Sequence, residues 1–567
     1  MKPLFVSLLL IAFCSCRPVE PTEQHALSKE QTRSLVALGQ LWGFLKYHHP
    51  AVAEGTLDWD AVLIDLIPRV MDAKNEEAGK SLLDSLIKSL PAVRANHTSG
   101  QAKDVSQKAD YGILFDSTYY NRETIDSLQC LLEGVRLTEN HYVRINPRRM
   151  SGEPLITVTN EASYPEMVFP TLPYRILALC RYWSFINYYF PYRELCDVRW
   201  SDALAFMLPD FVYAGNQKEY ALACLKLASL TNDSHAFVHM ADSTTRNDIY
   251  GRRKVPFEVQ FVENELVVTS FTDASSNLSK ELSPGDIITA INGEKVQTVV
   301  ARLYPYMPAS NDASKHRDIA RIILQTNDSV LNIGCVHNGK LFTKRIPTYA
   351  IGQLNIPDLF NSKPEQEGYS ILGDSIGYIY PATCKYEERE TKLPRLMANT
   401  KGLIIDLRCY PADYNALAIA PYLMKHGGYY CRQAYGTVAM PGYTFFSAYN
   451  SLPVSLEVGR YPHKVVVIVN EITQSQAEDH TFFYYLAPQV TIIGSTTAGA
   501  NGAVARFTLP GNIECTITGV GMYYPDGTCT QRTGVKLDET VYPTIAGIKQ
   551  GRDEVLERAI EIVLKYR

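Results

Sequence analysis

The chain contains 567 residues, which is too many for one hydrophobic core, because single domains usually contain roughly 100–200 residues. Hydrophobic residues make up 46% of the sequence and charged residues 20%, as in ordinary globular proteins. The net charge of −5 comes without any sustained run of Lys and Arg, so we expect no nucleic-acid partner.

The first residues are typical of an export signal. The apolar run Leu4–Phe13 follows a basic residue and is too short to span a bilayer. Cys14 and Cys16 come next, and the small residue Ser15 before Cys16 resembles a bacterial lipobox. We therefore expect residues 1–16 to be a lipoprotein signal peptide with Cys16 as the lipid anchor. The protein would cross the inner membrane and stay in the cell envelope, in the periplasm or at the outer membrane. An ordinary secretion signal cut nearby is the alternative.

Ten cysteines follow Cys16, and they form neither a CxxC pair nor a Cys/His quartet of the zinc type. His235 and His239 have the spacing of a zinc-binding helix, but the adjacent Glu of that motif is missing. No phosphate-binding Walker loop or GxGxxG sequence is present. We expect no metal and no other cofactor. For the ten cysteines, disulfide bonds and buried free thiols are both compatible with the sequence.

One stretch of sequence occurs twice. Residues 41–50 (LWGFLKYHHP) resemble residues 182–191 (YWSFINYYFP), and each copy is followed by a second tryptophan, Trp59 or Trp200. After each copy, apolar residues recur at intervals of three and four, which predicts amphipathic helices that pack together. The repeated aromatic residues indicate packing. Between the copies, residues 110–165 alternate in the manner of strands.

The pattern changes to short strands and turns from about residue 252. Residues 282–296 (LSPGDIITAINGEKV) predict a turn, a strand, an Asn-Gly hairpin turn and another strand, and they resemble a PDZ domain. Domains of this kind bind a peptide as an additional strand at a sheet edge. Residues 255–257 lack the Gly-rich turn of a carboxylate-binding loop, which favours peptide binding over capture of a terminal carboxylate. A purely structural module is the alternative.

From about residue 366 onward, strands alternate with helices. Residues 402–407 and 464–470 are continuous apolar runs, as in strands that are buried on both faces, and residues 490–494 indicate another strand. The sequence therefore predicts an α/β unit with a largely parallel sheet.

Ser475 lies where the second of these strands is followed by a helix. A helix N-terminus offers free N–H groups and a positive dipole end, which stabilise a developing oxyanion. Ser is also a favoured N-cap, and Glu478 three residues later completes the pattern of a capping box. By itself, this local pattern favours a structural role.

Several ordered motifs around Ser475 resemble the catalytic core of peptidase family S41. The resemblance covers roughly residues 175–567, with the PDZ-like segment as the expected companion. It implies a crotonase/ClpP-like core of ββα units and peptide or unfolded protein substrates. The motifs are Asp406-Leu407-Arg408, Ser475-Gln476-Ala477-Glu478, Gly494–Gly499, Phe507–Gly511 and Tyr524–Gly527, followed by Gly534-Val535 and Gly551–Asp553.

That family has two catalytic arrangements, and the sequence distinguishes them. The carboxyl-terminal processing arrangement needs a Lys 25 residues after the serine, where this chain has Ala500. The tricorn-like arrangement takes a Ser-His pair from an upstream helical segment, and Ser234-His235 stand at the end of the second helical repeat. The resemblance implies Ser475 as nucleophile, His235 as general base and Ser234 as a hydrogen-bonding relay.

The same resemblance implies oxyanion donors and an orienting group. The backbone N–H of Gln476 is expected to be one donor, and the other is expected near Cys409, where residues 411–413 (PAD) replace the usual Gly-Gly. Gln531 occupies the place of a Glu in tricorn-like enzymes. Its carbonyl can accept a hydrogen bond from Ser234, but it supplies no negative charge.

We therefore expect an α/β multidomain protein with two functional alternatives. The leading one is a cell-envelope serine peptidase, either an endopeptidase or a C-terminal peptidase, that works through an acyl-enzyme. The other is a catalytically inert, PDZ-containing, peptide-binding lipoprotein scaffold, which the neutral Gln531 and the altered loop after Arg408 favour. The expected segments are the signal peptide 1–16, an N-terminal helical/β domain 17–165, the second helical repeat with the catalytic His 166–250, a PDZ-like domain 251–350 and the catalytic core 351–567.

Overall fold

The computed structural model describes residues 27–96, 103–147, 154–272, 278, 281–424, 426–452 and 460–566. The predicted signal peptide and the predicted lipid anchor Cys16 lie outside these ranges. Within them, no helix has both the length and the apolar character that a membrane span requires. The ten cysteines that the structure describes form no disulfide bonds with one another, and most of them are buried.

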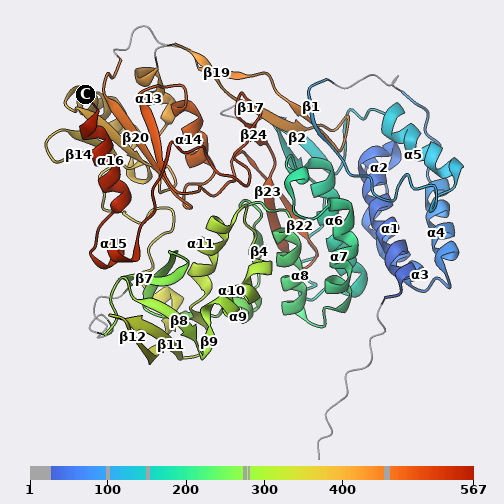
Figure 1. Cartoon of the computed structure of the whole chain (residues 1–567). Helices are drawn as coiled ribbons and strands as arrows, with labels where there is room; N and C mark the ends of the chain where they lie inside the picture. Colours follow the sequence, from blue (N-terminus) through green and yellow to red (C-terminus); the bar gives the residue numbers. More distant parts are fainter. Residues whose placement is uncertain are drawn as a thin grey trace, which may run out of the picture.

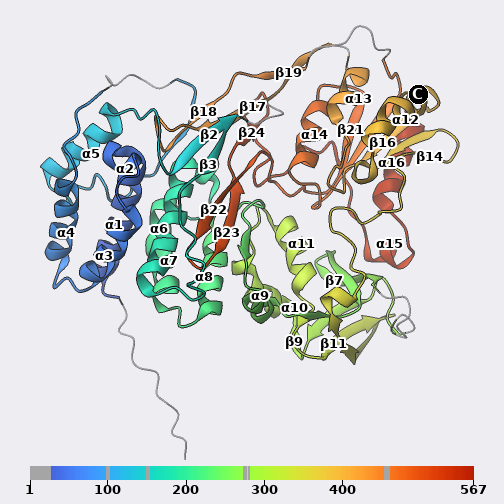
Figure 2. The ribbon, with the colours of Figure 1, turned by 180° about the vertical axis from the view of Figure 1, so that it is seen from behind.

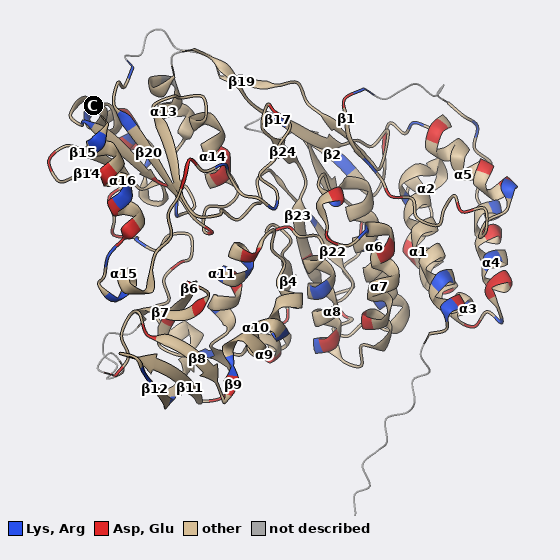
Figure 3. Cartoon of the chain, in the orientation of Figure 1, with Lys and Arg blue, Asp and Glu red and all other residues tan. Residues whose placement is uncertain are grey.

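Two helical units stand side by side at the N-terminal end of the protein (Figure 1). Ser28 starts the first helix with a complete capping box. Figure 3 shows acidic and basic residues interspersed along α4 and α8, which each expose one face. The first unit contains α1 (Lys29–His48), α2 (Pro50–Ala53), α3 (Trp59–Met71) and α4 (Glu76–Ser89), and the second contains α6 (Leu172–Tyr189), η1 (Arg193–Leu195), α7 (Trp200–Tyr213) and α8 (Gln217–Ser229).

The two copies of the duplicated stretch make the same pair of hydrogen bonds. The indole N–H of Trp42 donates to the carbonyl oxygen of Trp59 (2.7 Å), and the indole of Trp59 donates back to the carbonyl oxygen of Trp42 (3.0 Å). Trp183 and Trp200 repeat this exchange at 2.7 and 2.9 Å. Each indole is thus buried with its polar atom satisfied. The paired bonds fix the first long helix of each unit against the helix that follows it.

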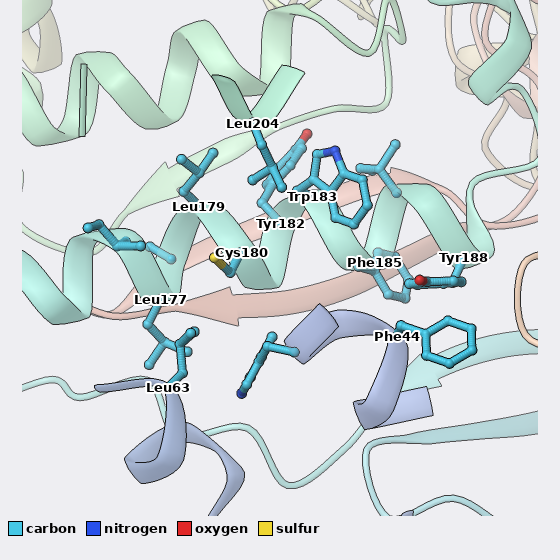
Figure 4. Packing of buried hydrophobic residues seen from close by; sticks show 14 of the residues in the cluster. Phe44, Leu63, Leu177, Leu179, Cys180, Tyr182, Trp183, Phe185, Tyr188 and Leu204 are labelled. Carbon is cyan, nitrogen blue, oxygen red and sulfur yellow. The ribbon is translucent and has the colours of Figure 1, made fainter. Parts of the chain in front are cut away.

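The two units meet where α1 packs against α6. Gly43 lies on Ser184 so closely that a Cβ atom at position 43 would be 2.0 Å from the Ser184 hydroxyl oxygen. Figure 4 shows Phe44 and Leu63 of the first unit beside Tyr188 and Leu177 of α6, while Trp183 points to the other side of α6, toward Leu204. The absence of a side chain at position 43 therefore permits the close approach on which this shared core depends.

The stretch 110–165 differs in part from its predicted alternation of strands. It contains the hairpin of β2 (Val143–Pro147) and β3 (Pro154–Val158), but residues 122–134 form helix α5. The Asn121 side chain caps this helix, and the apolar residues behind it recur at helical spacing, which outweighs the alternation. The buried members of that face are Ile125, Leu128 and Leu131.

The segment predicted to be PDZ-like contains an antiparallel sheet with the strand order β12-β11-β8-β7-β6 and helices packed against it. The predicted hairpin turn is present, since Asn292 and Gly293 have φ values of 50° and 84°. Figures 1 and 2 place this unit below the C-terminal core and beside α8 and α9 (Ser243–Tyr250). The strands are β5 (Arg253–Lys254), β6 (Phe257–Val262), β7 (Glu265–Phe271), β8 (Ile287–Ile291), β9 (Glu294–Lys295), β10 (Gln325–Thr326), β11 (Val330–His337), β12 (Lys340–Pro347) and β13 (Tyr349–Ala350), and the helices are α10 (Val296–Leu303) and α11 (Asp312–Ile322).

The C-terminal core is built on a sheet with the order β14-β15-β16-β20-β21-β25, which is parallel from β15 to β25. The three predicted strands are confirmed as β16 (Gly402–Asp406), β20 (Lys464–Val469) and β21 (Val490–Gly494). Helices α12, α13 and α14 pack on one face of this sheet and α16 on the other. The remaining elements are β14 (Tyr369–Leu372), β15 (Ile376–Ile379), α12 (Tyr386–Ala398), α13 (Ala416–Leu423), α14 (Gln476–Tyr484), β25 (Glu539–Thr540), α15 (Ile545–Lys549) and α16 (Glu554–Lys565).

Two smaller sheets join the core to the helical units. In the first, β1 (Val105–Lys108) from the N-terminal region pairs with β18 (Tyr443–Phe446). In the second, β4 (Val238–Met240) pairs with β23 (Ile513–Thr518), which itself pairs with β22 (Val504–Leu509). Strand β4 begins three residues after His235, so this sheet brings the predicted base to the C-terminal half. The first sheet is completed by β17 (Gly428–Gly436), β19 (Asn450–Leu452) and β24 (Gly521–Tyr523).

The contact of Gly43 with Ser184 predicts that Gly43→Ala destabilises the protein by up to about 2 kcal/mol. Overpacking costs typically about 1–3 kcal/mol, and the better helix propensity of Ala offsets about 1 kcal/mol of this. Urea or thermal unfolding measures the change, with Gly352→Ala as a matched control, since a Cβ at position 352 meets nothing within 4 Å. Adding Ser184→Gly should reveal a favourable coupling energy in the double-mutant cycle. Purely additive effects would contradict the predicted contact.

Candidate active site

Ser475 occupies a strained turn between β20 and α14. Its φ is 56°, a region that non-glycine residues rarely adopt, and its amide N–H donates to the carbonyl oxygen of Ala500 at 2.9 Å. It is the N-cap of α14, yet its side chain makes no capping bond. The capping box that was the structural alternative is therefore not formed. Within the described part of the chain, the Ser475 hydroxyl has no hydrogen-bond partner.

Glu478 stabilises this turn from inside the core. Its buried carboxyl group accepts hydrogen bonds from the amide of Gly499, the amide of Ala500 (both 2.9 Å) and the hydroxyl of Thr497 (2.5 Å). Burial raises the pKa of Glu478 to about 7, although these donors favour the charged form. The residue expected to cap the helix thus fixes the loop 497–500 against α14 instead.

The two predicted oxyanion donors lie on adjoining loops. The hydroxyl of Thr473 donates to the carbonyl oxygen of Leu407 at 2.7 Å, which joins the loop before Ser475 to the loop that contains Cys409. The amide N–H of Gln476 begins α14, and among the described residues it has no acceptor. The same holds for the amide of Cys409, whose thiol is buried and has its pKa raised by that burial. The Thr473–Leu407 bond thus holds the loops that contain Gln476 and Cys409 together.

The Asp-Leu-Arg motif stabilises the Cys409 loop through ion pairs of Arg408. The guanidinium of Arg408 binds the carboxylates of Asp406 and Asp553 at distances of 2.7–2.9 Å. Burial alone would raise the pKa of Asp406, but Arg408, with the Lys363 ammonium 3.5 Å away, holds it well below its usual range. The motif thus has a structural role, connecting β16 to the start of α16.

His235 is buried at the turn that follows α8. Its Nδ1 lies 2.8 Å from the hydroxyl oxygen of Thr518, the last residue of β23. The Thr518 hydroxyl donates to Oδ1 of Asp233 (3.0 Å), and the Thr518 amide donates to Oδ2 of Asp233 (2.8 Å). The Nε2 atom of His235 is buried and has no partner in the described structure.

The electrostatic surroundings keep His235 neutral near neutral pH. Burial lowers the pKa of His235 below its usual value, and the Asp233 carboxylate raises it part of the way back. A neutral imidazole with a free Nε2 is the form that a general base requires.

Ser234 and Gln531 make contacts other than those expected. The Ser234 hydroxyl donates to the carbonyl oxygen of Ala498 (2.8 Å) and accepts from the amide of Ser310 (2.9 Å), at the start of the segment leading into α11. The amide nitrogen of Gln531 donates to the carbonyl oxygen of Asn232 (3.1 Å), and its Oε1 is unpartnered in the described structure. No described hydrogen bond links Gln531 to Ser234, because the Ser310 segment and the loop at Ala498 occupy the Ser234 hydroxyl.

The structure brings the predicted base and nucleophile segments together. The side-chain amide of Gln474 donates to the carbonyl oxygen of Ser234 at 3.1 Å, although the two residues are 240 positions apart. The loop 497–500 also contacts both segments, through Ala498 and Ala500. Among the described hydrogen bonds, none joins Ser475 to His235 directly.

A cleft of about 2110 Å³ is lined by residues that neighbour His235 and Ser475 in the sequence, while these two residues do not line it themselves. Ala236 and Phe237, which directly follow His235, line one side, and Ile472 and Ser495 of the core line another. The PDZ-like unit contributes β6, α10 and α11 to its walls. Phe237 is 65% exposed, which leaves an apolar side chain unburied next to the predicted base.

Sequence reasoning had missed two of the polar residues around His235. Asp233 stands two positions before His235 in the same motif, so its position in the sequence could have indicated a role beside the histidine. Thr518 had none, because only the pairing of β4 with β23 brings it beside the imidazole.

Comparisons with known proteins agree with this architecture. Residues 375–541 match the model of peptidase family S41. Mature CPAF aligns with a TM-score of 0.56 at 13% identity, over 70% of this chain and 97% of that chain. Mature CPAF complexed with lactacystin gives a TM-score of 0.53 at 13% identity, over 69% and 97%. A putative peptidase from Parabacteroides merdae ATCC 43184 gives 0.42 at 16% identity, over 70% and 97%. No curated protein matches the sequence. At 13% identity, the likeness to the two CPAF structures establishes the fold alone.

The strained conformation of Ser475 predicts that Ser475→Gly is more stable than Ser475→Ala by about 1 kcal/mol. Glycine adopts φ 56° without the strain of about 1–3 kcal/mol that other residues suffer, but it loses more backbone entropy on folding. Both variants lack the hydroxyl, so thermal unfolding compares them without a catalytic difference. Equal stability of the two variants, or a more stable alanine variant, would contradict the assigned backbone strain.

Proposed function

We propose, on the premise that residues 375–541 belong to peptidase family S41, that the chain is a serine peptidase with Ser475 as nucleophile and His235 as general base. Family membership supports peptide-bond hydrolysis and peptide or protein substrates. One observation carries the assignment of residues. Nε2 of His235 has no hydrogen-bond partner in the described structure, the Ser475 side chain does not cap α14, and the Gln474–Ser234 bond joins their segments.

In the proposed reaction, His235 first accepts a proton as a base and then donates it as an acid. Nε2 of His235 accepts the hydroxyl proton of Ser475 as the serine oxygen attacks the carbonyl carbon of the scissile bond. The amides of Gln476 and Cys409 donate hydrogen bonds to the resulting oxyanion. The imidazolium then gives its proton to the leaving amine, and water hydrolyses the acyl-enzyme by the same steps. Hydrogen bonds between catalytic groups are often long without substrate and shorten when it binds, so the unpaired Ser475 and His235 fit the substrate-free state.

The cleft supports an extended peptide as the substrate. Sites for small molecules usually enclose about 300–1000 Å³, whereas this cleft has about 2110 Å³ and runs between the core and the PDZ-like unit. The two edges of that unit's main sheet are β12 and β6, and β6 lines the cleft. A peptide that pairs with such an edge would lead toward Ser475, as either an endopeptidase or a C-terminal peptidase requires.

An inert peptide-binding scaffold is the second candidate. Gln531 supplies no negative charge, and no described hydrogen bond yet joins Ser475 to His235. Both alternatives use the same cleft, so the reactivity of Ser475 distinguishes them.

We expect a fluorophosphonate probe to label the folded protein at Ser475. Ser475→Ala should abolish labelling, and His235→Ala should slow it by at least about 100-fold, because general base catalysis contributes roughly 10²–10⁴-fold. Mass spectrometry of the labelled peptide identifies the site. His239→Ala is the matched control, since His239 is exposed on β4 four residues further on and should leave the rate unchanged. An unreactive wild-type protein would establish the scaffold instead.

The cell-envelope location is part of the proposal and rests on residues 1–16. Expression of the full chain in a Gram-negative host should give a membrane-associated protein that incorporates an alkyne-tagged fatty acid. Cys16→Ala should lose both the tag and the membrane association, whereas Cys14→Ala should keep both. A Cys16→Ala protein that still carries the fatty acid would contradict Cys16 as the anchor.

A further inference from the structure

The hydrogen bonds around His235 fix the position of each proton. The Thr518 hydroxyl has a single hydrogen, and the acceptor-only carboxylate of Asp233 lies 3.0 Å from its oxygen. That hydrogen points to Asp233, so the same hydroxyl oxygen can only accept from Nδ1 of His235, 2.8 Å away. Nδ1 therefore carries the imidazole proton, and Nε2 presents its lone pair.

The Asp233 carboxylate is itself held in place by the fold. It accepts from the Thr518 amide (2.8 Å), the Thr518 hydroxyl and the backbone amide of His235 (3.1 Å). The Asp233 side chain is fully buried, and no ion pair to it occurs among the described residues. Its negative charge is thus directed at the imidazole, where it stabilises the imidazolium that forms during proton transfer.

We propose that Asp233 and Thr518 are positioning residues for His235, with the Thr518 hydroxyl relaying the Asp233 carboxylate to Nδ1. This inference rests on the proposed function. It assigns the role of orienting acid to Asp233, two positions before His235, and not to position 531.

The contacts of Gln531 fit this assignment. Its amide nitrogen lies 3.4 Å from Oδ1 of Asp233 and donates to the neighbouring carbonyl oxygen of Asn232 (3.1 Å). A carboxylate at position 531 would face Asp233 at close range with the same charge, which destabilises both ionised forms. An amide there avoids the repulsion and donates a hydrogen bond instead. The neutral Gln531 is therefore compatible with an active site whose negative charge is already supplied by Asp233.

Thr518→Val removes the hydroxyl at constant shape, and Thr518→Ser keeps it. The measurement is the rate of fluorophosphonate labelling as a function of probe concentration and pH, on the full chain, with thermal unfolding as a check of folding. Thr518→Val should lower the maximal labelling rate at least about 10-fold, which is a part of the roughly 10²–10⁴-fold that general base catalysis contributes, with little change in the half-saturating probe concentration. Thr518→Ser should stay within about 3-fold of the wild type, since it retains the relay oxygen.

The pH profile separates a positioning role from a structural one. Labelling needs neutral His235, so the rate falls below the pKa of His235. The charged group facing His235 is Asp233. Losing the Thr518 acceptor, or the charge in Asp233→Asn, disfavours the imidazolium and lowers that pKa further. The acidic limb should therefore move to lower pH in Thr518→Val and Asp233→Asn, and stay in place in Thr518→Ser.

Each result decides the inference. A folded Thr518→Val protein with wild-type rate and an unmoved acidic limb would overturn the relay while leaving the peptidase proposal intact. A Gln531→Glu variant that reacts faster than wild type would also overturn it, because the orienting acid would then belong at position 531. Failure of the wild-type protein to react at all would overturn both proposals together.

Discussion

The loop 497–500 is the element on which the arrangement of the candidate site depends. Its amides and the Thr497 hydroxyl bind the buried carboxyl group of Glu478, and its carbonyl groups accept from the Ser475 amide and the Ser234 hydroxyl. One short segment therefore fixes the serine turn on one side and the histidine segment on the other. Because Glu478, Thr497 and Ser234 are buried, displacing any of these partners would leave unpaired donors or acceptors in the core, which is costly.

This arrangement explains how a strained residue persists. The φ of 56° at Ser475 is unfavourable by itself, but the bond from its amide to Ala500 and the hold of Glu478 on the same loop leave the backbone no relaxed alternative nearby. The strain directs the Ser475 side chain away from a capping bond. The sequence alone fits Ser475 both as a helix N-cap and as a nucleophile. The φ angle of Ser475 distinguishes the two, because at 56° its side chain makes no capping bond.

Much of the architecture was predictable from periodicity. The runs 402–407, 464–470 and 490–494 could be identified as strands because a parallel sheet buried on both faces leaves a continuous apolar run. The duplicated Trp-aromatic-Pro stretch predicted packed helices, which are α1 and α6 with their successors. The alternation over residues 110–165 led to a wrong prediction of strands at α5. This helix exposes polar residues between its apolar ones, and in a short window such a pattern fits the helical period and the strand period equally.

The candidate site was predictable only where its residues lie in one motif. Ser475, Gln476 and the Ser234-His235 pair come from recognisable local patterns, whereas Thr518 and Ser310 reach the site through tertiary pairing. The partners of Ser234 and Gln531 could not be predicted for the same reason, since side-chain bonds between distant segments leave no trace in local spacing. Asp233 is part of the recognisable Asp-Ser-His sequence. Its contact with the site depends on the hydrogen bond from the Thr518 hydroxyl, which local spacing does not predict.

The three-stranded sheet β22-β23-β4 has a consequence for how the protein is divided. Its edge strand β4 comes from residues 238–240, far outside the segment 375–541 that similarity alone delimits. Excising that segment would strip β23 of its neighbour and expose a row of backbone donors and acceptors, which invites aggregation. It would also leave Ser475 without any histidine from the upstream helices. A fragment that keeps β23 paired on this side must therefore extend upstream of the matched segment at least as far as β4.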